Sequence, residues 1–254
     1  FGSSRAVQPR PSRRHCLPLP STASQGAMGA SVSTYIRGAA IDFAKVKSPK
    51  DFLHFILCGL GIELSKIFGH SATVWEFMFK HCNLGAKMQD GSQVARYLEI
   101  KEVLAQVLPK GGAVLDVGCG TGNGLRLWRE VGVGSFEGID ISKTAIDAAR
   151  AAYADVPDTR FTTASIGSYD AQGRTFDVVL ATEVLYLVSD PEADVKKMRA
   201  LTKPGGHLVI SMSDTSYSDK VWAMLGQKLP APVVRRAIKS AEGNKWTVAA
   251  IKVD

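Results

Sequence analysis

The chain has 254 residues, which is enough for one sizeable α/β domain with an extension. Its hydrophobic and charged fractions are 45% and 22%, as in ordinary globular proteins, and its formal charge is +7. Residues 1–50 hold eight Lys or Arg and one acidic residue, whereas residues 51–254 hold 23 charged residues of each sign. The excess charge therefore belongs to the N-terminal segment, and we expect no nucleic-acid partner from composition alone.

The first segment, residues 1–47, is basic and contains no acidic residue before position 42. Its arginines stand among Ser, Thr, Ala, Gly and Pro residues. A basic, hydroxyl-rich and acid-poor N-terminal segment is typical of an organelle transit peptide. We therefore expect this arm to direct the protein to a mitochondrion or a plastid. A disordered basic linker is the alternative, and it would leave the protein in the cytoplasm.

Residues 48–110 have the apolar spacing of helices and predict an N-terminal helical cap. The most apolar run, Phe52–Ile62, is too short to cross a bilayer. We interpret it as a buried helix, with an interfacial membrane helix as the alternative. Residues 1–68 are accordingly the part of the chain in which we expect any contact with a membrane surface or a multisubunit complex.

The clearest helix of this cap spans Ser92–Leu108 and ends at Pro109. Ser92 has the side chain of an N-cap residue. The predicted apolar stripe consists of Val94, Tyr97, Leu98, Val103, Leu104 and Val107.

Residues 111–254 alternate between short apolar segments and segments with helical spacing. The predicted strands cover 113–118, 135–142, 160–165, 176–181, 207–212 and 245–253, and the predicted helices cover 123–132, 142–155 and 190–206. This alternation predicts an α/β fold with a doubly wound, mostly parallel sheet, whose ligands bind at the carboxyl ends of the strands. Between 217 and 241 we expect two helical pieces separated at Pro230, which would leave the sheet one strand short.

The cysteines Cys16, Cys58, Cys82 and Cys119 are scattered without CxxC spacing, and the five histidines lack the spacing of metal ligands. The sequence therefore predicts no metal site and no disulfide framework.

A glycine-rich loop follows the first strand of this domain, in the stretch VLDVGCGTGNG. Its glycines are Gly118, Gly120, Gly122 and Gly124. No Lys follows them, which excludes a P-loop. A dinucleotide fingerprint, GxGxxG, does not fit either, because it lacks its third glycine whether it is aligned from Gly118 or from Gly120. The pattern that fits is acid-x-Gly-x-Gly-x-Gly, beginning at Asp116.

At residues 113–212 the chain resembles the class I S-adenosylmethionine-dependent methyltransferases. VLDVGCGTG matches the first motif of that family, and Gly138–Asp140 matches the second. FDVVLATEVLYLV and LTKPGGHLVIS match the signatures of the fourth and fifth strands. The resemblance implies S-adenosyl-L-methionine as the cofactor. It assigns cofactor binding to Asp116, Gly118, Gly120, Gly122, Asp140, Ile141, Ser165 and Ile166.

The chemistry of these residues agrees with that cofactor. Backbone N–H groups at a helix N-terminus favour its carboxylate, and Asp116 can meet its ammonium group directly or through water. Asp140 is placed to accept hydrogen bonds from both ribose hydroxyls. Many members of the family carry an acid after the third strand for the adenine amino group, whereas this chain has Ser165. The backbone N–H of Ile166, or Asp170 further along, is the alternative contact.

The sulfonium of this cofactor is already activated, so the enzyme mainly has to align a nucleophile and exclude water. The catalytic residues are not evident, although Glu183 and Tyr186 lie just past the fourth strand and are weak candidates. Orienting a loop is the alternative role for Glu183. Helices before the first strand often form a lid in similar proteins, which brings in Arg96 and Tyr97, with core packing as the alternative for Tyr97. No NPPY-type tetrapeptide follows the fourth strand, so we expect a small-molecule acceptor.

Three functions remain open. The first is a methyltransferase that acts on a small molecule by in-line displacement. The second is a non-catalytic subunit that uses the same fold as a scaffold in a larger organellar assembly, with residues 1–68 as its anchor. The third, a dehydrogenase, has the least support.

Overall fold

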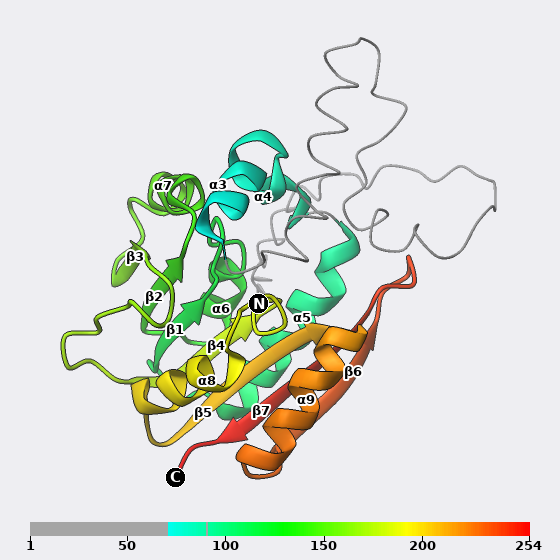
Figure 1. Ribbon diagram of the computed structural model, residues 1–254. Coiled ribbons are helices and arrows are strands. Elements are labelled where there is room, and N and C mark those ends of the chain that lie inside the picture. The colour runs from blue at the N-terminus through cyan, green and yellow to red at the C-terminus, as the bar shows by residue number, and fades with distance from the viewer. Residues whose placement is uncertain (1–70, 90) are drawn as a thin grey trace, which may run out of the picture.

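The computed structural model describes residues 71–89 and 91–254 (Figure 1). The predicted basic arm, the predicted helix at Phe52–Ile62 and the first part of the predicted cap lie outside the described residues. Within the described ranges, no helix is long and apolar enough to span a lipid bilayer.

A seven-stranded sheet forms the centre of the domain (Figure 1). Its strands are β1 (Ala113–Val117), β2 (Ser135–Asp140), β3 (Thr159–Thr163), β4 (Phe176–Thr182), β5 (Thr202–Ser213), β6 (Val234–Lys239) and β7 (Lys245–Lys252). Their order is β3-β2-β1-β4-β5-β7-β6. Strands β1 to β5 are parallel, whereas β7 is antiparallel to both β5 and β6. The expected doubly wound, mostly parallel sheet is confirmed, and the carboxyl ends of β1 to β4 meet at one edge.

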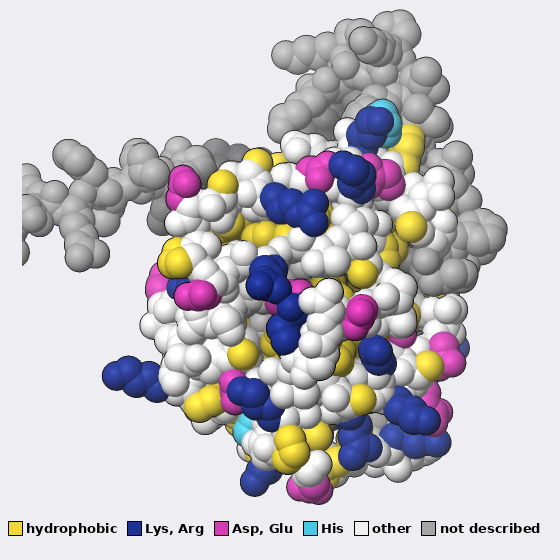
Figure 2. All heavy atoms as spheres, turned by 90° about the vertical axis from the view of Figure 1, so that its left-hand side faces the viewer, with side chains coloured by type: hydrophobic (Ala, Val, Ile, Leu, Met, Phe, Trp, Pro, Cys, Tyr) yellow, Lys and Arg dark blue, Asp and Glu magenta, His cyan; other side chains and the backbone are white. Residues whose placement is uncertain are grey.

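Helices cover both faces of the sheet. On these faces lie α5 (Gly91–Val107), α6 (Leu125–Glu130), α7 (Lys143–Ala152), α8 (Pro191–Leu201) and α9 (Ser216–Lys228). The other described helices, α3 (Ala72–His81) and α4 (Leu84–Lys87), form a separate cluster, and α3 packs beside α7. One buried cluster joins the sheet to α8 and α9, and a second joins it to α5, α6 and α7 (Figure 1). Over the face that carries α7 and β3, Lys and Arg side chains are interspersed with Asp and Glu (Figure 2).

The segment after α9 corrects one expectation. Val234–Lys239 forms the edge strand β6 and not a second helical piece, so the sheet has the strand that we expected to be missing. Ile238 is buried and opposes Trp246 of β7, whereas Arg235 and Arg236 are exposed. Charged side chains on an edge strand discourage pairing with further strands. The pairing with β7, and not the residue pattern alone, distinguishes the segment from a helix.

The helix α5 forms as predicted, but its buried face differs from the predicted stripe. Val94 and Leu98 are 47% and 46% exposed. The residues that α5 buries are Arg96, Ile100, Val103 and Leu104. Because α5 begins at Gly91, Ser92 lies inside the helix and is not its N-cap, which corrects that assignment.

Other predicted boundaries are tested by hydrogen bonds. Ser142 is the N-cap of α7, since its hydroxyl accepts a hydrogen bond from the N–H of Ala145. The helix predicted for 190–206 ends at Leu201, because the residues from Thr202 onward pair with β4 as part of β5. Cys119 is a free, buried thiol, whereas Cys82 is disulfide-bonded, a bond that the scattered cysteines did not predict. Among the described residues, no group of His, Cys, Asp and Glu is arranged to hold a metal ion.

Candidate cofactor and acceptor site

A cavity of about 310 Å³ opens at the carboxyl ends of β1 to β4. Its floor is made by four segments, one after each strand: Val117–Gly118, Asp140–Ile141, Ala164–Gly167 and Thr182–Val184. The side chains of Trp75, Phe79 and Met88 line it from the α3–α4 region, and Leu187, Val188, Ser189 and Asp194 line it from the loop after β4 and the start of α8. This is the edge at which open α/β sheets bind their ligands.

Among the predicted site residues, Gly118, Asp140, Ile141, Ser165, Ile166 and Glu183 line this cavity. Asp116, Gly120 and Gly122 are not among the lining residues: Asp116 lies behind the floor at the end of β1, and the two glycines continue the loop from Gly118. Tyr186 reaches the cavity wall indirectly, through Glu183.

The glycine loop has the conformation that its sequence requires. Gly118 has a φ of +73°, and a Cβ at that position would lie 2.2 Å from the side chain of Val184. The N–H groups of Gly118, Gly120 and Gly122 donate to Ile139 O, Asp140 Oδ2 and Cys119 O, respectively. The glycine amides are therefore not the free donors that we expected. The N–H of Thr121, between them, has no acceptor among the described residues and remains available to a ligand.

Asp116 lies at the end of β1, between Gly138 of β2 and Leu180 of β4, and is buried. Its Oδ1 accepts no hydrogen bond from the described residues. Burial raises the pKa of this carboxyl from 3.8 to about 7. The indole N–H of Trp128 and the guanidinium of Arg96 oppose the increase, and the nearby carboxylate of Asp140 adds to it. A buried acceptor without a donor carries an energetic cost that a ligand ammonium group would relieve.

Asp140 ends β2 and is held by the backbone on both sides. Its Oδ2 accepts a hydrogen bond from Gly120 N at 3.0 Å, and its Oδ1 accepts one from Ser142 N at 2.9 Å. Burial raises its pKa, and these two hydrogen bonds oppose that increase. Each carboxylate oxygen can accept a further hydrogen bond, so Asp140 is fixed in place and still able to receive a diol.

The loop after β3 supplies backbone rather than side-chain contacts. The hydroxyl of Ser165 is engaged with Ser168, lying 2.9 Å from Ser168 Oγ and accepting a hydrogen bond from Ser168 N. The N–H of Ile166 has no acceptor among the described residues, and Ile166 lines the cavity. Asp170, the alternative acid, is exposed, accepts a hydrogen bond from Gln172 N and lies outside the cavity lining. The structure therefore does not bring Asp170 to the site.

Glu183 follows β4 in the left-handed backbone region, with a φ of +61°. Its Oε2 accepts hydrogen bonds from Tyr186 Oη at 2.9 Å and Ser213 N at 3.2 Å, and its Oε1 lies 3.5 Å from Arg96 Nη1. These contacts join the loop after β4 to the end of β5 and to α5. They favour the loop-orienting role for Glu183 over direct proton transfer.

Arg96 is the site-region residue whose contacts sequence reasoning did not anticipate. It is 3% exposed, lies over the ring of Tyr97 at 4.8 Å, and its Nε has no acceptor among the described residues. The sequence offered no signal for these contacts, because the predicted apolar stripe of this helix did not include Arg96.

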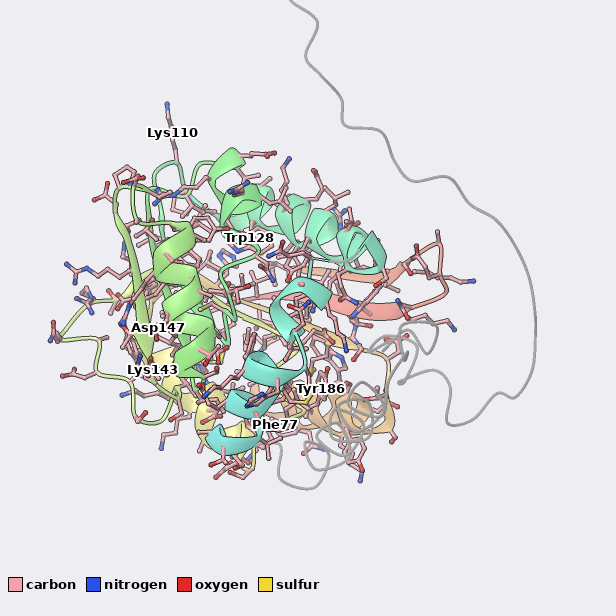
Figure 3. All side chains as sticks on the ribbon, turned by 90° about the horizontal axis from the view of Figure 1, so that it is seen from above. Phe77, Lys110, Trp128, Lys143, Asp147 and Tyr186 are labelled. Atoms are coloured by element: carbon pink, nitrogen blue, oxygen red, sulfur yellow. The ribbon has the colours of Figure 1, made fainter. Side chains whose placement is uncertain are left out.

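The α3–α4 region is attached by polar contacts to the segments after β1 and β2, two of the four that form the floor of the cavity. Glu76 of α3 accepts hydrogen bonds from Ser142 and Thr144 at the start of α7. Gln89 Nε2 donates to Asn123 Oδ1 at 2.9 Å, within the glycine loop. Figure 3 shows α3, marked by Phe77, beside the start of α7, marked by Lys143.

Comparison with known proteins agrees with this geometry. The model of a family described as a methyltransferase domain matches residues 88–248. The ubiquinone biosynthesis O-methyltransferase of Coxiella burnetii is 29% identical over 130 residues, which are 51% of this chain and 55% of that protein. The trans-aconitate 2-methyltransferase of Variovorax paradoxus is 33% identical over 116 residues, 45% of this chain and 44% of that protein. The chain thus spans about half the length of these curated relatives.

Solved structures show the same fold. The N-methyltransferase NodS from Bradyrhizobium japonicum WM9, in complex with S-adenosyl-L-homocysteine, aligns with a TM-score of 0.55 and 17% sequence identity. The alignment covers 65% of this chain and 88% of that one.

Proposed function

Because the chain belongs to the class I S-adenosylmethionine-dependent methyltransferases, we propose that it transfers the methyl group of S-adenosylmethionine to a small-molecule acceptor. The observation that carries this proposal is the cavity, which brings the loops after β1, β2, β3 and β4 together. It brings the carboxylate of Asp140, which we assign to the ribose, and the amide of Ile166 to the same cavity. Asp116 lies buried at the end of β1 with an oxygen that lacks a donor.

The residues present fit the cofactor. Asp140 would hold the ribose hydroxyls, the N–H of Ile166 would meet an adenine nitrogen, and Asp116 would receive the ammonium group. The N–H of Thr121 and the buried guanidinium of Arg96, which is near enough to lower the pKa of Asp116, favour the carboxylate. When bound, S-adenosylmethionine supplies a methyl group on a leaving sulfonium. The protein then has to orient the acceptor and exclude water.

The acceptor side of the cavity is largely apolar. Trp75, Phe79 and Met88 line it from the cap, and Leu187 and Val188 line it from the loop after β4. Such walls suit an acceptor with an apolar or aromatic body. The relatives named for ubiquinone biosynthesis and for trans-aconitate methylation also support a small molecule as the acceptor.

Calorimetry with S-adenosylmethionine, S-adenosylhomocysteine and NADH tests the cofactor assignment. We expect binding of the first two and none of NADH. Transfer of an isotopically labelled methyl group to a panel of quinols, phenols and carboxylic acids, read by mass spectrometry, then tests catalysis and identifies the acceptor. Binding of NADH alone would make the protein a dehydrogenase. Absence of all binding would favour the scaffold role.

We also propose that residues 1–47 target the protein to a mitochondrion or plastid, and that residues 1–68 make any contact with a membrane or a larger complex. The basic, acid-poor composition of the arm supports this location. A fusion of residues 1–47 to a fluorescent protein should enter one of these organelles. Cytoplasmic fluorescence would contradict the targeting role and favour a linker.

A further inference from the structure

We propose that Glu76 is a positioning residue that holds the cap on α7 and thereby keeps Trp75 and Phe79 in place as a wall of the cavity that would enclose both cofactor and acceptor. Release of the cofactor would then require this anchor to open. The inference rests on the proposed function, because the wall is defined by the cavity that would hold S-adenosylmethionine.

The anchor is a carboxylate at the start of a helix. Glu76 Oε2 accepts hydrogen bonds from Ser142 Oγ at 2.8 Å and from Thr144 N at 3.0 Å, and Oε1 accepts one from Thr144 Oγ1. The first turn of α7 has free N–H groups and a positive dipole end, which favour a negative charge there. The Thr144 hydroxyl and amide, which are the largest causes, lower the pKa of Glu76 to about 2.

The same contacts connect the anchor to the proposed ribose site. Ser142 donates its hydroxyl to Glu76 and its backbone N–H to Asp140 Oδ1. On α3, Trp75 precedes Glu76 directly and Phe79 follows it by three residues, and both line the cavity. A single helical turn therefore joins the anchored carboxylate to the two aromatic side chains.

The packing of the cap explains why an anchor is needed. Met78 and Cys82 form a small buried cluster with Val74, Phe77 and Leu84, separate from the two clusters that join the helices to the sheet. Because this cluster is internal to the cap, its members do not attach the cap to the domain. The hydrogen bonds of Glu76 do so, together with Phe79 and Met88, which lie close to Gly120. The contacts on the other side are those of Asn123, which accepts from Gln89 Nε2 and donates to Gly85 O at 3.4 Å.

The test uses Glu76→Gln and Thr144→Val in the full chain. Glutamine has one acceptor oxygen and would present an NH₂ group to the donors of α7, whereas valine removes the Thr144 hydroxyl and keeps its amide. Asp147→Asn is the matched control, because it removes an exposed carboxylate of α7 whose ion pairs are with Lys143 and Arg150 of the same helix. Figure 3 shows Asp147 and Lys143 on α7.

Two measurements are made on each protein. Hydrogen exchange without ligand should speed up in residues 72–88 of Glu76→Gln while β1 and β4 stay protected. The dissociation rate of S-adenosylhomocysteine, followed by stopped-flow fluorescence, should rise on the order of tenfold in Glu76→Gln and less in Thr144→Val. Asp147→Asn should match the wild type in both measurements.

The outcomes separate the two proposals. Unchanged exchange and an unchanged dissociation rate in Glu76→Gln would overturn the anchor while leaving the cofactor assignment intact. Wild-type protein that does not bind S-adenosylhomocysteine would overturn the proposed function, and exchange in residues 72–88 would still decide whether Glu76 holds the cap. If Glu76→Gln does not fold, Thr144→Val carries the same comparison.

Discussion

At the scale of single residues, the site depends on two buried carboxylates, Asp116 and Asp140, that can each accept hydrogen bonds from a ligand. Asp140 is held by two backbone N–H groups, whereas Asp116 has an oxygen without a donor. The two acids therefore differ in what a ligand must supply. Asp140 is held in place before a ligand binds. Burial disfavours the ionised form of Asp116, so a ligand must supply a positive charge to stabilise that form.

This difference predicts a pH dependence of binding. Because the pKa of Asp116 is about 7 in the ligand-free protein, an ammonium group must displace a proton below that pH. Affinity for S-adenosylhomocysteine should fall by up to ~10-fold per pH unit below pH 7. Calorimetry between pH 5.5 and 8.5, in buffers of different ionisation enthalpy, would count the released proton. Asp116→Asn should flatten the profile, and an equally steep profile would contradict the assignment.

The raised pKa of Asp116 also predicts how the free energy of unfolding changes with pH. The change is opposite in sign to that of an ion-paired acid, whose pKa is lowered on folding. The pKa of Asp116 is raised on folding, so its contribution to stability is fully present below 3.8 and is lost as the pH rises through about 7. Denaturant unfolding without ligand should show Asp116→Asn gaining stability relative to wild type as the pH is raised from 5 to 8. A constant difference across this range would count against a protonated Asp116.

Replacement of Asp140 tests the ribose contact directly. Asp140→Ala removes the acceptor for both hydroxyls and should weaken binding of S-adenosylmethionine by ~1–3 kcal/mol. Because Asp140 also holds Gly120 and Ser142, circular dichroism must first show that the variant folds. A folded variant that binds S-adenosylmethionine with wild-type affinity would contradict the assignment of Asp140 to the ribose hydroxyls.

At the scale of helices and strands, capping fixes where elements begin at the site. Asp190 caps α8 by accepting a hydrogen bond from Ala193 N at 2.9 Å, just after the loop that lines the cavity. Asp190→Ala should lower the free energy of unfolding by ~1 kcal/mol. Glu192→Gln, at an exposed position of the same turn, is the control and should change stability less. Equal losses in the two variants would show that charge and not capping matters.

The elements themselves were largely predictable, because apolar segments alternate with helical segments from residue 113 to residue 212. The strand β6 was not predictable. Its apolar and charged residues suit either a helix or an exposed edge strand, and the pairing with β7 decides between them. The glycine loop and Asp140 were found from motif spacing. The contact of Glu76 with Thr144 could not be predicted from the sequence. It joins residues 68 positions apart, which meet only because α3 packs on α7.

At the scale of the whole molecule, ligand binding and folding are linked. A ligand that binds the folded chain at 100 times its dissociation constant should raise the free energy of unfolding by ~2.7 kcal/mol. For a domain of this size that corresponds to a rise of roughly 5–10 °C in the melting temperature. Thermal scans with S-adenosylhomocysteine should show this rise, and scans with NADH should not. An equal shift with both ligands would argue against a specific cavity.

The order of strands also constrains how the domain is made. β6 precedes β7 in the chain, yet in the described structure its ladder of hydrogen bonds runs to β7. During synthesis on the ribosome, Val234–Lys239 will therefore emerge before its neighbour exists. β6 can pair only when residues 245–252 have left the exit tunnel. The edge formed by β7 and β6 therefore assembles last, when β1 to β5 can already be in place.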